Sequence, residues 1–294
     1  MSWPYQFVTP SEEEKVRRRE LLDLRGSYAQ YSIILMAIVL RVYQVRAHFA
    51  QGEIKDQRRR GQLTWWDRPL FAGWLETRRQ YALCGLWLLW LIGLSFWNTG
   101  NDYLHLTKAL GHVALSQVSL QILMSPAAYI FSSRPASPSM FSVMTSIPQT
   151  VLTPYHRLFG RLVISPLLIG HAVLYLLFFA QSSHPEFGRL LNKRVRDFDV
   201  QCGLMAVSIL VSVMFFQRPR AASSQTATRG RLAVRSIRER RQSFYWGHIA
   251  LVGLLCLAAY YHVAHAHFYM LQALGAFAVN GVVSWGTVRW ARRS

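Results

Sequence analysis

Long apolar stretches are the feature of this sequence that most limits how it can fold. Seven of them approach or exceed the roughly 20 residues that a helix needs to cross a bilayer. They cover residues 28–45, 81–97, 103–130, 156–179, 201–216, 244–262 and 268–288. Because hydrocarbon offers no water to backbone groups, each span must satisfy its own hydrogen bonds as a helix.

The sequence therefore predicts an all-α fold, a polytopic membrane helical bundle of about seven transmembrane helices in contact with the lipid bilayer. We expect a polar N-terminal tail at residues 1–26, which has no cleavable signal pattern, followed by a transmembrane domain at residues 27–294. Residues 132–154, rich in serine and proline, predict a flexible cytosolic connection.

The formal net charge of +19 comes from basic residues in the connecting segments, an arrangement typical of loops that face anionic lipid and not of a nucleic-acid-binding protein. The connections between the first and second spans and between the fifth and sixth spans carry eight Lys or Arg residues each. Such connections favour the cytosol, which puts the N-terminus outside and the C-terminus inside. The basic connection after the fourth span argues the other way. The host membrane is either the plasma membrane or an internal one.

Two spans each carry a pair of histidines, and ionisable groups inside a membrane are functional candidates because burying them is costly. His156 and His171 lie in the fourth span with fourteen residues between them, and His248 and His262 lie in the sixth with thirteen. Helical geometry predicts separations of about 22 and 21 Å along the axis and angular offsets of about 60° and 40°. Each pair therefore shares one face of its helix.

Two helices with matched histidine pairs form a four-cornered arrangement. His156 can face His248 at the cytosolic end, and His171 can face His262 at the outer end. Each pair can supply two axial imidazoles to a haem iron, so that two stacked haems would conduct electrons across the membrane. A single intramembrane histidine is more often an interfacial or hydrogen-bonded residue, which is the alternative for each position.

Several motifs resemble the transmembrane domain of the fungal ferric (metallo)reductases, relatives of the NADPH oxidases. They are TGNDYLHLTK (99–108), GH (111–112), HRLFGR (156–161), HAVLY (171–175), RQSFYWGH (241–248) and YHV (261–263). The resemblance implies two haem b groups held by the histidines at positions 156, 171, 248 and 262. It also implies electron flow from cytosolic NADPH through FAD and the haems to an acceptor such as ferric or cupric ion.

The fourth span departs from that family, in which thirteen residues usually separate the two histidines of this helix. Ser165 and Pro166 lie inside the longer interval of this chain. Proline removes a helical hydrogen bond, and helices commonly absorb one extra residue as a π-bulge. We therefore expect a bulge or kink near Pro166 that restores the facing of His171.

The sequence ends at Ser294, soon after the last span, without the FAD and NADPH lobes of the family. We expect FAD and NADPH to act only through a partner, a cytosolic flavoprotein reductase that docks on the basic face; ascorbate or a quinol is the alternative donor. The chain could also be a fragment of a longer reductase. The alternative function is a non-catalytic membrane subunit of the same fold, acting with a flavoprotein or in a biosynthetic pathway, so the sequence leaves open whether the chain is an enzyme.

Other polar residues have two interpretations each. Arg157 and Arg161 could bind the propionates of the inner haem, since guanidinium groups pair with carboxylates, or could anchor the cytosolic end of the helix. His105 and His112 could serve a substrate or proton path, but a packed polar pair is favoured. The histidines at positions 262, 265 and 267 could hold iron or copper, but an interfacial role is favoured.

Overall fold

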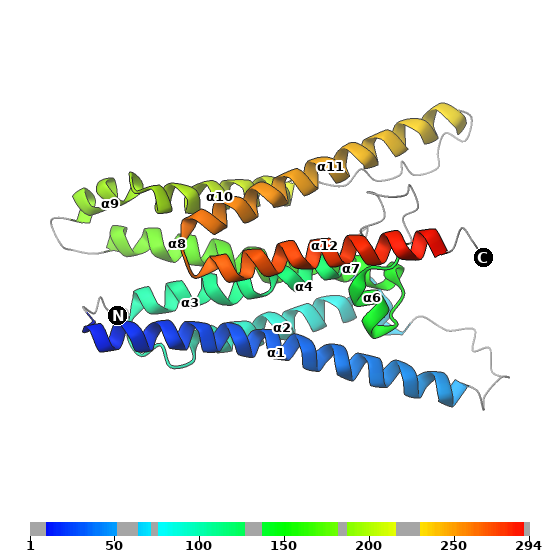
Figure 1. The fold of residues 1–294 in the computed structure, drawn as a ribbon, viewed down its shortest axis with the longest axis horizontal. Helices are drawn as coiled ribbons and strands as arrows, with labels where there is room; N and C mark the ends of the chain where they lie inside the picture. The colour runs from blue at the N-terminus through cyan, green and yellow to red at the C-terminus, as the bar shows by residue number, and fades with distance from the viewer. Residues whose placement is uncertain are drawn as a thin grey trace. The chain divides into compact units, whose positions relative to one another are not determined.

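The computed structural model describes residues 10–51, 64–71, 76–126, 137–181, 187–215 and 230–290. These residues form helices and one isolated β-bridge, between Pro69 and Thr77, and they contain no β-strand. The elements are α1 (Glu12–Gln51), the 3₁₀ turn η1 (Trp65–Asp67), α2 (Arg78–Phe96), α3 (Tyr103–Ser116), α4 (Val118–Leu123), α6 (Met140–Thr145), α7 (Gln149–Phe159), the π-helical turn η2 (Gly160–Ile164), α8 (Ser165–Gln181), α9 (Phe187–Val195), α10 (Phe198–Phe215), α11 (Gly230–His262) and α12 (Ala266–Trp290) (Figure 1).

Within the described ranges, six helical stretches are long and apolar enough to cross a membrane. They are Glu12–Ala47, Arg78–Phe96, Gln149–Phe178, Phe198–Phe215, Gln242–His262 and Ala266–Thr287. The prediction of an all-α polytopic bundle is confirmed. The remaining predicted span, residues 103–130, folds as two shorter helices, α3 and α4, which meet at Gln117. Its last residues, 127–130, lie outside the described part of the chain.

The N-terminal helix runs without interruption through the expected boundary between tail and transmembrane domain. The segment before residue 27 is helical from Glu12 onward and packs against α3. Arg18 pairs with Asp102 at 2.6 Å, and the fully buried Arg25 donates to the carbonyl of Trp97. These contacts make the described part of the expected polar tail a packed extension of the first span.

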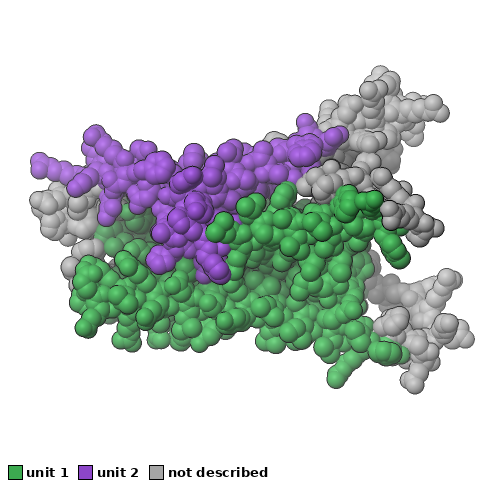
Figure 2. Space-filling view, viewed as in Figure 1, with its two compact units in different colours: residues 1–187, 271–294 green, residues 188–270 purple. Residues whose placement is uncertain are grey.

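The chain divides into two compact units, coloured separately in Figure 2. Unit 1 comprises Met1–Phe187 and Leu271–Ser294, and unit 2 comprises Gly188–Met270. In unit 1, α3 lies against α1, α2 and α8. Its residues are almost all buried, because a helix that carries polar side chains is stable in a membrane bundle only inside it.

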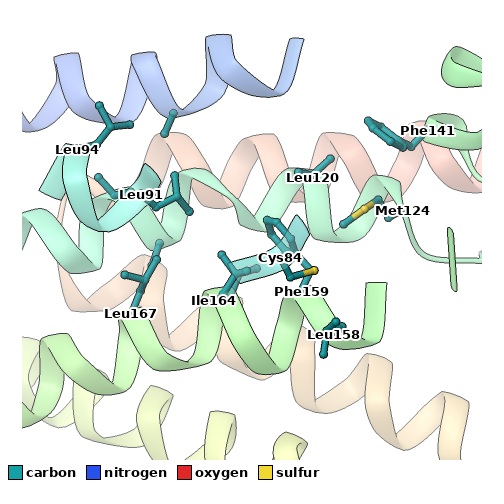
Figure 3. Packing of buried hydrophobic residues seen from close by; sticks show 14 of the residues in the cluster. Cys84, Leu91, Leu94, Leu120, Met124, Phe141, Leu158, Phe159, Ile164 and Leu167 are labelled. Carbon is teal, nitrogen blue, oxygen red and sulfur yellow. The ribbon is translucent and has the colours of Figure 1, made fainter. Parts of the chain in front are cut away.

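The core of unit 1 is an apolar cluster contributed by several helices (Figure 3). Leu91 of α2, Leu120 of α4, Leu158 of α7 and Leu167 of α8 are each at most 2% exposed. Large apolar side chains also cover the outer surface of the spans, as the lipid environment requires. The core therefore fixes α7, η2 and α8, the segment that carries His156 and His171, against α2 and α4.

The connection before α7 is more ordered than its composition suggested. Gln149 accepts from the backbone N–H of Ser139 and donates to the carbonyl of Met124. Asn280 of α12 accepts from the N–H of Met140 and donates to the carbonyl of Ile122. The prediction of a flexible connection at 132–154 is therefore wrong for residues 137–154, because two buried side-chain amides bond to the backbone there. Residues 132–136 lie outside the described range.

Unit 2 contains α9, α10, α11 and the first turn of α12. Helices α10 and α11 pack along one another. Cys202 and Leu210 of α10 and Ala258 and Ala259 of α11 are buried in this unit. The small alanine side chains let two helical backbones approach closely, which is the usual packing mode of membrane helices.

Candidate functional site

His156 is fixed at the end of α7 by the C-terminal end of α4. Its ring Nδ1 lies 2.9 Å from the carbonyl oxygen of Gln121, and the Gln121 side chain donates to the His156 carbonyl at 2.8 Å. A carbonyl can only accept, so Nδ1 carries a proton, and in the neutral ring the lone pair is on Nε2. Histidines that bind metals are commonly oriented by such a bond from the other ring nitrogen.

The interval between His156 and His171 contains the π-helical turn η2. The backbone N–H of Ser165 bonds to the carbonyl of Gly160, five residues earlier, and the Ser165 hydroxyl donates to the same oxygen at 2.7 Å. Pro166 follows at once and has no N–H to continue the helical ladder. The predicted bulge near Pro166 is therefore confirmed, and the serine hydroxyl stabilises it.

The π-helical turn changes the geometry expected of this helix. A π-turn absorbs about one extra residue, so the interval behaves like one that is a residue shorter. The expected rise becomes about 21 Å and the angular offset about 40°, the values for the regular pair on α11.

His171 of α8 is oriented by α3. Its ring Nδ1 lies 2.7 Å from the carbonyl oxygen of Thr107, which again leaves the lone pair on Nε2. The ring packs directly on Gly111, where an added Cβ would lie 3.1 Å from the imidazole Cγ and Nδ1. Tyr103 holds the same pair of helices together one turn away, through a 2.7 Å bond to the carbonyl of Leu174.

The two histidines of α11 lie in unit 2. The Nδ1 atom of His262 lies 2.7 Å from the carbonyl oxygen of Asp199, which is the arrangement found for His156 and His171. The Nδ1 atom of His248 is buried and has no hydrogen-bond partner among the described residues, and its ring stacks on Phe244. His248 therefore differs from His156, His171 and His262, because no carbonyl among the described residues fixes its tautomer.

The four candidate ligands are thus divided evenly between the two units. Three of them present Nε2 with its lone pair, the form of imidazole that binds iron. The donor set fits haem, and the ligand role of these histidines stays a prediction.

Arg157 and Arg161 both pair with the buried Glu76. The distances to Glu76 Oε1 are 3.4 Å from Arg157 Nε and 3.2 Å from Arg161 Nη2. Glu76 precedes Thr77, the residue that caps α2, and it lies in the connection that follows η1. Sequence reasoning missed Glu76 because its partners are more than 80 residues away; binding of propionates by the two arginines stays a prediction.

We expect replacement of Glu76 by glutamine to lower the thermal stability of the detergent-solubilised protein. The change leaves two guanidinium groups without a counter-ion, at a cost of about 1–3 kcal/mol. The arginine side chains are 32% and 48% exposed, so hydration limits the effect. The matched control is Glu12→Gln, whose exposed pair with Lys15 should contribute nothing measurable. Equal melting temperatures for the two variants would contradict this prediction.

His105, His112 and His267 contact neighbouring side chains. His105 and His112 are buried, and each contacts a residue of α1: His105 Nε2 lies 2.9 Å from Arg25 Nη1, and His112 Nε2 lies 3.4 Å from Asp23 Oδ1. The ring of His267 stacks on Tyr260 at 4.0 Å. No group of three or more metal-binding side chains occurs in the described ranges, so the histidines at 262, 265 and 267 do not converge as an ion site there.

A family model described as ferric reductase like transmembrane component matches residues 110–259, just over half of the chain. The chain belongs to this family. The matched region contains His156, His171 and His248 together with η2, whereas His262 lies three residues beyond it. Neither a curated protein nor a solved structure matches the chain. The protein is therefore a multi-pass membrane protein of the ferric reductase-like class, and the resemblance seen in the sequence is confirmed.

Proposed function

We propose that this protein binds two haem b groups and passes electrons across the membrane. His156 and His248 would hold the inner haem, and His171 and His262 the outer one. The observation that carries the proposal is the shared environment of three of these residues. His156, His171 and His262 each donate Nδ1–H to a backbone carbonyl, at 2.9, 2.7 and 2.7 Å.

The protein's own residues would perform three tasks. The carbonyls of Gln121, Thr107 and Asp199 select the tautomer in which Nε2 can bind iron, and they raise the basicity of the ring. The apolar core of unit 1 packs against the segment that carries His156 and His171 and holds it in place. When bound, haem would supply an iron that accepts and releases one electron at a time.

The electron path follows from the loop charges and from the family. With the basic connections in the cytosol, the N-terminus lies outside, and His171 lies nearer the outer surface than His156. Electrons would enter from a cytosolic flavoprotein that carries FAD and oxidises NADPH, and would leave to an acceptor such as ferric or cupric ion. The chain would then act as the membrane component of a metalloreductase.

A dithionite-reduced minus oxidised spectrum of the purified protein tests the proposal. We expect a b-type difference spectrum and, by pyridine haemochrome assay, two haems per chain. Protein purified from haem-supplemented cells that shows no haem band would overturn the electron-transfer role. It would favour the alternative, a non-catalytic membrane subunit of the same fold.

A further inference from the structure

Three glycines of the described helices touch a neighbouring side chain at the position where other residues carry a Cβ. An added Cβ at Gly111 would meet the ring of His171, one at Gly203 the ring of His262, and one at Gly160 the amide of Gln121. An added Cβ would have nothing within 4 Å at seven other glycines: Gly85, Gly93, Gly100, Gly170, Gly253, Gly275 and Gly286. All three of these close approaches therefore involve a candidate haem ligand or the residue that orients one of them.

Each of these glycines follows a particular carbonyl by four positions. Gly111 follows Thr107, whose carbonyl accepts from His171, and Gly203 follows Asp199, whose carbonyl accepts from His262. Gly160 stands in the same relation to His156, whose carbonyl accepts from Gln121.

Helical geometry explains this repeated spacing. A helical side chain leans towards the N-terminus and covers the turn before its own Cα. The residue at position i+4 therefore shields the carbonyl of residue i from the side. A glycine at i+4 exposes that carbonyl, whose second lone pair can accept a bond from outside the helix.

We propose that Gly111 and Gly203 are positioning residues that seat the two distal histidines, His171 and His262, for the outer haem. This inference rests on the proposed haem-binding function. Each glycine lets an imidazole ring pack closely against a neighbouring helix, so that its Nδ1 reaches a main-chain carbonyl and its Nε2 points away from that carbonyl. This arrangement of a glycine against an imidazole ring occurs once in each unit, on α3 and on α10.

The distances predict that alanine disturbs the ligand more at position 203 than at position 111. At Gly203 the added methyl group would lie 2.6 Å from His262 Cε1 and 2.7 Å from Nδ1, too close for the ring to stay. At Gly111 the closest distances are 3.1 Å, so a shift of a few tenths of an ångström would relieve the contact. Gly203→Ala should therefore lose the outer haem, whereas Gly111→Ala should keep it with a tilted ligand.

The experiment measures haem content, low-spin EPR spectra and the midpoint potential of each haem in full-length variants. We expect Gly203→Ala to fall from two haems to one per chain. Gly111→Ala should retain both haems but shift the EPR signal and the potential of one of them. The inner haem should be unchanged in both variants, a selectivity that general destabilisation would not produce.

Matched controls lie on the helices that carry the histidines. Gly170→Ala, next to His171 on α8, and Gly253→Ala, on α11, place a methyl group where nothing lies within 4 Å. Both should keep two haems with wild-type spectra. Wild-type spectra for both Gly111→Ala and Gly203→Ala would overturn the inference, as would equal disturbance of both haems.

The two proposals fail in distinguishable ways. Absence of haem from the wild-type protein rejects the proposed function. Two haems in the wild type that are indifferent to alanine at positions 111 and 203 reject only the positioning role. If Gly203→Ala is not recovered in folded form, Gly111→Ala decides the question, since its contact needs only a small adjustment.

Discussion

Replacing His171 by leucine is expected to remove the outer haem and leave the inner one. Replacing His248 by leucine should remove the inner haem and leave the outer one. The two histidines belong to different proposed pairs, and an iron that loses one imidazole no longer has the bis-histidine field that keeps it low-spin. Leucine cannot bind iron and is tolerated in a lipid-embedded helix. The measurement is haem content together with redox titration of each variant.

The pattern of losses carries the information in this experiment. His171→Leu and His262→Leu should spare the same haem, and His156→Leu and His248→Leu should spare the other. His265→Leu is the control, because His265 lies just past α11 and belongs to neither pair. Loss of the same haem from His171→Leu and His248→Leu would contradict the assigned pairing.

Deleting Leu162 from η2 is expected to preserve both haems, whereas inserting one alanine after Leu168 should abolish the outer one. The deletion removes the residue that the π-turn absorbs, so the helix can close as a regular α-helix with His171 still near Thr107. The insertion lies in regular helix and turns His171 by about 100°. It would also break the bond from His171 to Thr107.

Haem stoichiometry and the low-spin EPR signal distinguish these outcomes. The deletion should give two haems and the insertion one. A protein that tolerates the insertion but loses the outer haem on deletion would show that η2 does not set the facing of His171. A double variant with both changes has the original length and should resemble the insertion alone, because the added rotation follows η2.

The helical fold and the histidine pairs could be read from the sequence because both depend on local patterns. The length of an apolar run decides whether a helix can span the membrane, and a spacing near 14 residues puts two side chains on one face whatever their surroundings. The bulge before Pro166 could also be predicted from the sequence. It follows from one residue more than the spacing usual in the family the chain resembles, and from the missing N–H of Pro166.

The partners of the buried polar groups could not be predicted from the sequence. Arg25 looked like part of a polar tail, yet it is fully buried and bonds to His105, 80 residues away. Glu76 looked like one acid in a basic connection, yet it lies under Arg157 and Arg161. Composition also suggested a flexible connection around residue 140, where Asn280 in fact satisfies the backbone.

What the sequence alone determined, then, is the all-α membrane bundle and the family, and it singled out the four histidines as candidate ligands. Only the tertiary structure decided the orientation of His156, His171 and His262, because each bond runs to a carbonyl on another helix. At positions 111 and 203 no Cβ covers the carbonyl four residues earlier, and the contact exists only when the two helices are packed together. The glycines at positions 111 and 203 therefore gain their significance from the neighbour that lies against them.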